Sequence, residues 1–362
     1  MAVVCPPGGV HLNWKNRKSL LWLAAAGSAF CAYQLARRTG ALNSLDLKNK
    51  VVLITGGSRG LGFLLAREFA RSGARVAFCA RSAEELRTAQ QELERTGREV
   101  YPIRCDVSDR EQVDRMVQDV TQYYGPIDIL INNAGIMEVA PIQTMDLENF
   151  ERAMKVMFWG PLYAINAVLP SMLARRSGTI VNITSIGGKL SFPHLLPYSS
   201  AKFALMGLSE GLHAEVRNQG VRVVTVVPGF MRTGSYRQAF FAGNQKEEFE
   251  WFALGATMPL VSMNAERAAR EIVRAVRRGD AQPILSLPAN MAGRFHGLFP
   301  GLTNTLLAWT NAILPSPGPG RFAKGEEVEQ QIDSPLFKKA TALGTEAARR
   351  YQEKEADPSF AR

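Results

Sequence analysis

The chain has 362 residues, of which 46% are hydrophobic and 21% charged. This composition excludes a wholly disordered protein, and the length is sufficient to bury a large core. The formal net charge is +10, but Lys and Arg are dispersed without a long basic run, so we expect no nucleic-acid partner.

The first feature in the chain is an apolar segment over residues 19–36, which follows the basic N-terminal segment 1–18. Its 18 residues are at the short end of what spans a bilayer. Basic residues flank it on both sides, including Lys18 and Arg37, so charge does not set an orientation. Three interpretations compete: an uncleaved membrane anchor, a helix packed against the body, and a cleaved signal peptide.

From residue 50 onward, short apolar runs rich in β-branched residues alternate with amphipathic stretches of helical period. The runs cover residues 51–55, 75–79, 100–105, 127–131, 179–183 and 221–227, and the first helices cover 60–71, 83–95 and 111–124. This alternation predicts an α/β domain over residues 47–287 with a doubly wound parallel sheet, the Rossmann fold. Such sheets bind ligands at the carboxyl ends of their strands.

A glycine-rich turn separates the first predicted strand from the first predicted helix. It reads Thr55-Gly-Gly-Ser-Arg-Gly-Leu-Gly62. Glycine allows the backbone to turn sharply and to approach a diphosphate, and the free N–H groups at a helix start favour an anion. We therefore expect Gly56, Ser58, Arg59, Gly60, Leu61 and Gly62 to bind a dinucleotide.

The residues after the second and third strands indicate which dinucleotide is bound. The second strand ends at Arg81, where an NAD site would need a carboxylate for the ribose 2′-hydroxyl. Arg59 and Arg81 together could clamp a 2′-phosphate, which predicts NADP(H). Asp106 follows the third strand, where it could accept a hydrogen bond from the adenine amine or cap a helix.

Three further motifs follow in order. Residues 132–135 read Asn-Asn-Ala-Gly, Ser185 ends a later strand, and Tyr198 and Lys202 stand four apart on one helical face. With the glycine turn, these residues closely resemble the short-chain dehydrogenase/reductase family. The resemblance covers about residues 47–285.

The resemblance implies roles that ordinary chemistry supports. Tyr198 is the acid in carbonyl reduction and the base in alcohol oxidation. The Lys202 ammonium would lower the phenol pKa and hold the nicotinamide ribose, while Ser185 stabilises developing charge on the carbonyl oxygen. Further cofactor contacts are implied for Asn133, Ala134, Gly135, Tyr198, Lys202, Pro228, Gly229 and Thr233. The resemblance also implies a homo-oligomer formed through helices near residues 149–176 and 199–217.

One position departs from the family pattern. The family usually carries an asparagine in the helix after the fourth strand, where it anchors a proton-relay water. Met157 stands there, and a thioether is a poor hydrogen-bond partner. Other groups hold the water, turnover is slow, or the register is shifted by one turn.

The region after the last core strand indicates the substrate. Residues 234–260 contain the aromatics Tyr236, Phe240, Phe241, Phe249, Trp251 and Phe252, which either line an apolar pocket or pack a loop helix. Residues 288–314 form an apolar, membrane-associated or lid segment. Residues 315–362 read as a linker and a charged tail, which we expect to be a partly ordered, solvated appendage.

Taken together, the sequence predicts an NADP(H)-dependent oxidoreductase that interconverts a carbonyl and an alcohol on a lipophilic substrate. The alternative is a catalytically weak, cofactor-binding family member that acts as a redox sensor or scaffold. A cofactor-dependent enzyme needs a compartment that contains NADP(H), which favours the uncleaved membrane anchor over a signal peptide. His194 and His213 have no metal-ligand company, so we expect no metal, and Cys79 and Cys105 read as buried free thiols.

Overall fold

The computed structural model describes residues 28, 44–95, 97 and 99–353. The predicted anchor over residues 19–36 lies outside the described residues except for Ser28. The helices and strands belong to a compact unit that begins at Asp46.

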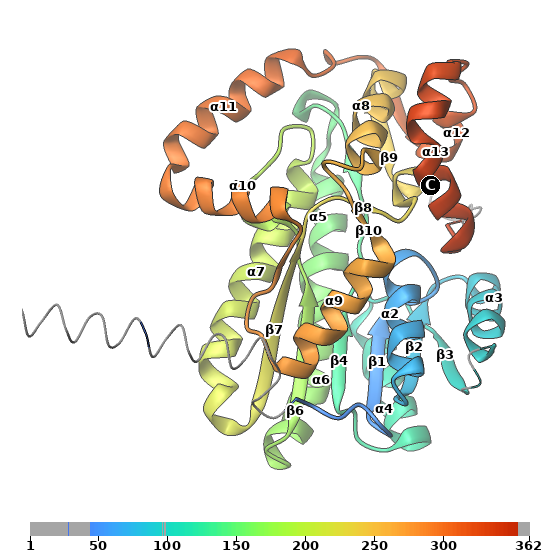
Figure 1. Ribbon diagram of the computed structural model, residues 1–362, viewed down its shortest axis with the longest axis vertical. Helices are drawn as coiled ribbons and strands as arrows, with labels where there is room; N and C mark the ends of the chain where they lie inside the picture. The colour runs from blue at the N-terminus through green and yellow to red at the C-terminus, as the bar shows by residue number, and fades with distance from the viewer. Residues whose placement is uncertain (1–27, 29–43, 96, 98, 354–362) are drawn as a thin grey trace, which may run out of the picture. The chain divides into compact units, whose positions relative to one another are not determined.

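The centre of this unit is a seven-stranded sheet in which every pair of neighbours is parallel (Figure 1). Its spatial order is β11 (Ile284–Leu285), β7 (Val221–Pro228), β6 (Gly178–Ile183), β4 (Ile129–Asn132), β1 (Val51–Thr55), β2 (Arg75–Ala80) and β3 (Val100–Arg104). The chain builds outward from β1 to β3 and then returns to the other side of β1. This reversal opens a crevice at the carboxyl ends of β1 and β4. The predicted doubly wound fold is confirmed.

Helices cover both faces of the sheet. One face carries α2 (Gly60–Arg71), α3 (Ala83–Glu94) and α9 (Ala265–Arg278); the other carries α4 (Arg110–Tyr124), α6 (Gly160–Ala174) and α7 (Leu196–Val216). A preceding helix, α5 (Leu147–Met154), runs into α6 through the π-helical turn η2 (Lys155–Trp159). Because both faces are covered, the central strands are apolar on both sides and β1 is buried at every position.

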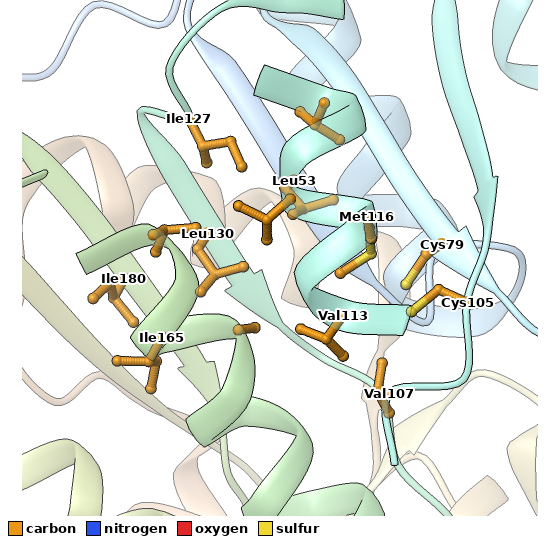
Figure 2. Packing of buried hydrophobic residues seen from close by; sticks show 14 of the residues in the cluster. Leu53, Cys79, Cys105, Val107, Val113, Met116, Ile127, Leu130, Ile165 and Ile180 are labelled. Carbon is orange, nitrogen blue, oxygen red and sulfur yellow. The ribbon is translucent and has the colours of Figure 1, made fainter. Parts of the chain in front are cut away.

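One core cluster fills the space between the sheet and helices α4 and α6. Leu53 and Leu130 from the sheet pack with Val113 and Met116 of α4 (Figure 2). The thiols of Cys79 and Cys105 lie side by side at one end of this cluster, both free and buried. The predicted buried free thiols are confirmed.

A smaller layer sits over the carboxyl edge of the sheet. Its three-stranded sheet has the order β12 (Gly320–Lys324), β9 (Phe240–Gly243) and β5 (Glu138–Val139), and β8 (Met231–Arg232) pairs with β10 (Met263–Asn264). Helix α8 (Gln245–Thr257) packs against α12 (Gly325–Glu329) and α13 (Pro335–Arg350). The segment from 320 to 353 is therefore part of the body, and our expectation of a solvated appendage was wrong. The apolar positions Phe337, Gly344 and Ala348 give α13 a face that must be covered.

Two helices, α10 (Leu287–Leu298) and α11 (Pro300–Ile313), form an arm that projects from the body (Figure 1). The arm presents large apolar side chains to solvent: Leu298 is 73%, Trp309 67% and Ile313 84% exposed. Among the described residues, one helical stretch, Leu147–Ala174, is long and apolar enough to cross a membrane. That stretch packs in the core through α5 and α6, so we do not interpret it as a membrane span.

Candidate active site

The glycine turn lies at the crevice where the strand order reverses. Gly56 has φ +66°, a left-handed conformation that favours glycine, and a Cβ on Gly62 would collide with the carbonyl oxygen of Gly56. The amide of Asn133 donates to the carbonyl oxygens of Thr55 and Gly56 at 3.0 and 2.9 Å. Helix α2 begins there with no side-chain cap, so its first N–H groups face the cleft.

The end of the cleft near β2 and β3 contains the residues predicted to select the dinucleotide. Arg59, Arg81 and Asp106 all line it. Arg59 is held by a carboxylate we did not predict, because its Nη1 lies 2.7 Å from Oε1 of Glu85. Asp106 accepts from the backbone and hydroxyl of Ser108 at 2.9 and 2.7 Å, while the N-cap of α4 is Asp109. The helix-cap alternative for Asp106 is therefore wrong.

The other end of the cleft brings the catalytic candidates together. Ser185 follows β6, and its Oγ accepts from the N–H of Gly187 at 3.0 Å, which leaves the hydroxyl proton free to point elsewhere. Tyr198 and Lys202 project from the first two turns of α7. The Nζ of Lys202 donates to the carbonyl of Ile183 at 2.8 Å and lies 5.7 Å from the centroid of the Tyr198 ring.

The pKa directions at this end differ from the simplest expectation. Burial raises the pKa of Tyr198, and a side-chain hydrogen bond with Ser185 opposes that rise. Burial also lowers the pKa of Lys202 to about 8. The expected lowering of the phenol pKa by Lys202 is therefore not seen, because desolvation penalises the charged form of both groups.

Met157 lies in the turn η2, between α5 and α6. It is fully buried in the π-helical turn η2, and a Cβ on Gly135 would lie 3.5 Å from its sulfur. Gly135 closes the Asn-Asn-Ala-Gly motif beside the cleft. The thioether of Met157 therefore lies buried beside this motif, and its correspondence to the family's asparagine stays a prediction.

A buried polar network lies below the catalytic residues and links three strands to α7. Asn132 donates to Asn182 at 2.8 Å, Asn182 donates to Ser209 at 2.9 Å, and the hydroxyls of Ser209 and Thr225 are 2.6 Å apart. Buried hydrogen bonds of this kind fix the position of α7 relative to the sheet. They therefore fix where Tyr198 and Lys202 point.

All the predicted site residues line a single cleft of ≈ 330 Å³. They are Gly56, Ser58, Arg59, Gly60, Leu61, Gly62, Arg81, Asp106, Asn133, Ala134, Gly135, Ser185, Tyr198, Lys202, Pro228, Gly229 and Thr233. The glycine cradle and the start of α2, which has no side-chain cap, fit a dinucleotide diphosphate. The role of each residue in binding it stays a prediction.

Sequence reasoning missed Glu85, Lys324 and Glu353, which also line the cleft. Glu85 stands four residues after Arg81 in the first turn of α3, so its proximity to the cleft could have been read from the helix start. Lys324 and Glu353 come from the C-terminal segment. The apolar period of α13 was the one signal that this segment packs against the body.

The aromatic residues between 234 and 260 mostly serve packing. Tyr236, Phe241 and Phe249 are fully buried in a core cluster that includes side chains from the C-terminal segment. Only Phe240 and Phe252 of the six line the cleft. Of the two interpretations left open, ordinary packing explains the majority of these residues.

The two histidines near the motifs have structural partners. His194 is buried with its Nδ1 2.7 Å from Oε1 of Glu248, whose other oxygen accepts from the indole of Trp251 at 2.7 Å. The Nδ1 of His213 lies 3.0 Å from the carbonyl oxygen of Val223. Over the part of the chain that the structure describes, no cluster of side chains could hold a metal ion.

Known proteins are similar to this chain in sequence. A family model described as short chain dehydrogenase matches residues 50–241. An Anopheles gambiae protein named dehydrogenase/reductase SDR family protein 7-like is 37% identical over 196 residues, 53% of this chain and 62% of that protein. The chain thus matches less than two thirds of that relative's length. Bos taurus dehydrogenase/reductase SDR family member 7B is 30% identical over 269 residues, 72% of this chain and 81% of that protein.

Solved structures give the same picture. A short-chain dehydrogenase from Streptomyces avermitilis aligns with a TM-score of 0.62 and 30% identity, covering 73% of this chain and 97% of its own. L-sorbose reductase from Gluconobacter frateurii, solved with NADPH and L-sorbose, aligns with a TM-score of 0.59 and 25% identity over 67% of this chain and 97% of its own. The family model spans more than half of the chain, and the predicted motifs converge on one cleft. This chain belongs to the short-chain dehydrogenase/reductase family of oxidoreductases.

Proposed function

We propose that the protein uses NADP(H) to interconvert a carbonyl and an alcohol on a lipophilic substrate, with Tyr198 as the acid and base. The observation that carries the proposal is the convergence of Ser185, Tyr198 and Lys202 on the same cleft as the glycine turn. A bound dinucleotide supplies or accepts the hydride. The side chains of this chain supply the proton and the polar contacts.

In the reducing direction, the Tyr198 hydroxyl donates its proton to the substrate oxygen as negative charge develops there. The Ser185 hydroxyl donates a second hydrogen bond to that oxygen. The phenolate that remains is stabilised by the ammonium of Lys202 and is reprotonated from solvent. Lys202 is held for this role by its hydrogen bond to the carbonyl of Ile183.

The preference for NADP(H) rests on charge at the end of β2. Arg59 and Arg81 both line this end of the cleft, and no carboxylate occupies the position at which an NAD site carries one. Glu85 pairs with Arg59 and accepts from the Ser58 hydroxyl at 2.9 Å. A 2′-phosphate would have to exchange with Glu85 for these donors, and its larger charge favours the exchange.

The lipophilic character of the substrate, and an association with membranes, are supported by the exposed apolar arm. Residues 287–313 include no acidic residue, and Arg294 is the one Lys or Arg among them. Exposed leucine and tryptophan side chains on consecutive helices suit the boundary between lipid and water. Helix α10 packs beside the loop after Ser185 through Ala289 and Ile186. An apolar substrate could therefore pass from the membrane to the catalytic serine along the arm.

We also propose that the protein pairs with a second copy of itself through η2, α6 and α7. Trp159 of η2 and Phe203 of α7 are each 43% exposed, and the Trp159 ring stacks against that of Tyr163. Exposed aromatic residues are enriched at protein interfaces.

A second candidate function is a cofactor-binding protein with weak catalysis that acts as a redox sensor or scaffold. Met157 favours it, because a buried thioether cannot hold a relay water in the way an amide does.

One experiment tests the leading function and separates it from the second. Purified full-length protein is incubated with NADPH and matched methyl ketones of increasing chain length, and loss of NADPH absorbance is followed. We expect kcat/KM to rise with chain length, because each buried methylene contributes about 0.8 kcal/mol of apolar burial. A preference for the shortest, most polar ketones would contradict the lipophilic assignment.

The matched variant is Tyr198→Phe, which removes one oxygen and keeps the ring. We expect kcat to fall by about 10²- to 10⁴-fold, the usual worth of general acid catalysis. NADPH affinity, measured by fluorescence, should change little. NADPH binding without turnover of any ketone in the parent protein would favour the sensor or scaffold.

A further inference from the structure

The end of the C-terminal segment lies inside the dinucleotide cleft. Helix α13 packs closely against the backbone at Gly234, next to Thr233. The approach is so close that a Cβ on this glycine would strike Ala348. After the helix, Gln352 adopts φ +64° and the N–H of Glu353 donates to the carbonyl of Ala348 at 3.0 Å. This left-handed turn reverses the chain and directs Glu353 back toward the glycine turn.

Two acceptor groups of the segment meet the start of α2. The carbonyl oxygen of Tyr351 accepts from the N–H of Gly60 at 2.8 Å. The Glu353 carboxylate lies on the other side of Gly60, with Oε1 2.5 Å from where a Cβ of that glycine would be. Its Oε2 is 3.5 Å from Nε of Arg59 and has no hydrogen-bond donor in the described part of the chain.

These contacts are not a surface feature. Glu353 is 4% exposed and Tyr351 3% exposed. A carboxylate buried to this degree normally has a full set of donors, because leaving it without them is costly. A buried carboxylate placed against a helix start that has no side-chain cap, and near an arginine, offers the negative charge and the oxygen acceptors that a phosphate also offers.

We propose that residues 351–353 are an intramolecular competitor for the dinucleotide phosphates, with Glu353 setting the affinity of the cleft for the cofactor. The inference rests on the proposed use of a dinucleotide. A phosphate needs the same Gly60 N–H and Arg59 guanidinium that the segment now occupies. Carboxylate and phosphate repel each other, so the cofactor binds fully only when this segment withdraws.

The ionisation of Glu353 makes the same contact dependent on pH. Burial raises its pKa to about 7, Glu85 adds to the rise, and Arg59 and Arg237 oppose it. Lys324 lines the same cleft. Glu353 is therefore largely neutral at pH 6 and charged at pH 8, so its competition with the cofactor should weaken as pH falls.

The test measures NADPH affinity of the full-length protein by fluorescence, without any substrate. Glu353→Gln keeps the size and removes the charge, and we expect its dissociation constant to fall about tenfold at pH 8. Ending the chain after Arg350 should produce at least the same gain. Glu346→Gln is the matched control. Glu346 also lies on the C-terminal segment, but it pairs with Arg350 at 3.8 Å and does not line the cleft.

The pH dependence of NADPH binding in the same variants distinguishes competition by Glu353 from a purely structural role, which would not change that dependence. The parent protein should bind NADPH more tightly at pH 6 than at pH 8, and Glu353→Gln should lose most of that difference. Hydrogen exchange of residues 345–353 should increase when NADPH is added. Equal or weaker binding by Glu353→Gln and by the shortened chain would overturn the inference, while absence of binding in every variant would overturn the proposed function itself.

Discussion

The two ends of the cleft are built in different ways. At the catalytic end, Ser185 follows β6, and Tyr198 and Lys202 come from α7, which the buried network of Asn132, Asn182 and Ser209 fixes to the sheet. At the phosphate end, the glycine turn is completed by Glu353, some 290 residues further along the chain.

In the proposed function, this difference separates the residues that carry out the reaction from the residues that control cofactor binding. The catalytic end depends on the central sheet, so changing it risks both the fold and the reaction. The segment 351–353, which contacts the glycine turn, lies outside the central sheet, so in the proposed competition its contacts exchange while the sheet stays intact.

Among the predictions that test this comparison, the largest effect on cofactor affinity is expected at Arg81, which lines the phosphate end of the cleft. We expect Arg81→Ala to raise the dissociation constant of NADPH about 10- to 100-fold, because charge-assisted hydrogen bonds contribute about 1.5–3 kcal/mol. NADH affinity should stay within about twofold. Fluorescence titration with both cofactors measures the effect.

The control for this prediction is Arg87→Ala, which removes an exposed guanidinium from α3 and should alter neither affinity. Equal weakening of NADPH and NADH by Arg81→Ala would show that Arg81 supports the fold of the cleft instead of selecting the 2′-phosphate.

The next effect concerns the charge at the catalytic end. Burial lowers the pKa of Lys202 from 10.5 to about 8, so the ammonium is lost as pH rises past 8. We expect kcat/KM for ketone reduction to fall by up to about tenfold per pH unit above that value. Lys202→Arg stays charged and should lack this fall, although a guanidinium fits the carbonyl of Ile183 less well.

Thermal unfolding distinguishes this titration from loss of structure. Between about pH 8 and 10.5 the unfolded chain binds more protons at Lys202 than the folded chain does. Stability from this group therefore rises with pH over that range. Activity that declines together with Tm would contradict an active-site titration.

How far the sequence predicts each region follows from the same contrast. The strands, the glycine turn and the spacing of Tyr198 and Lys202 are local patterns, so they could be read directly. The position of Glu353 depends on where α13 packs and on the turn at Gln352, and neither is set by nearby sequence. The direction of the Tyr198 pKa was also wrong, because burial around α7 comes from distant elements.

The smallest effect tests the one place where the catalytic end departs from its family. Met157→Asn restores an amide beside Gly135, and we expect kcat to rise roughly three- to tenfold, about 1 kcal/mol of transition-state stabilisation. The same change buries a polar group in an apolar site, so Tm should fall, with a cost of about 1–3 kcal/mol. Met157→Leu keeps the volume without the amide and should leave kcat unchanged. An unaltered kcat in Met157→Asn would mean that proton supply does not limit turnover. Differences in rate would then come from cofactor binding at the other end of the cleft.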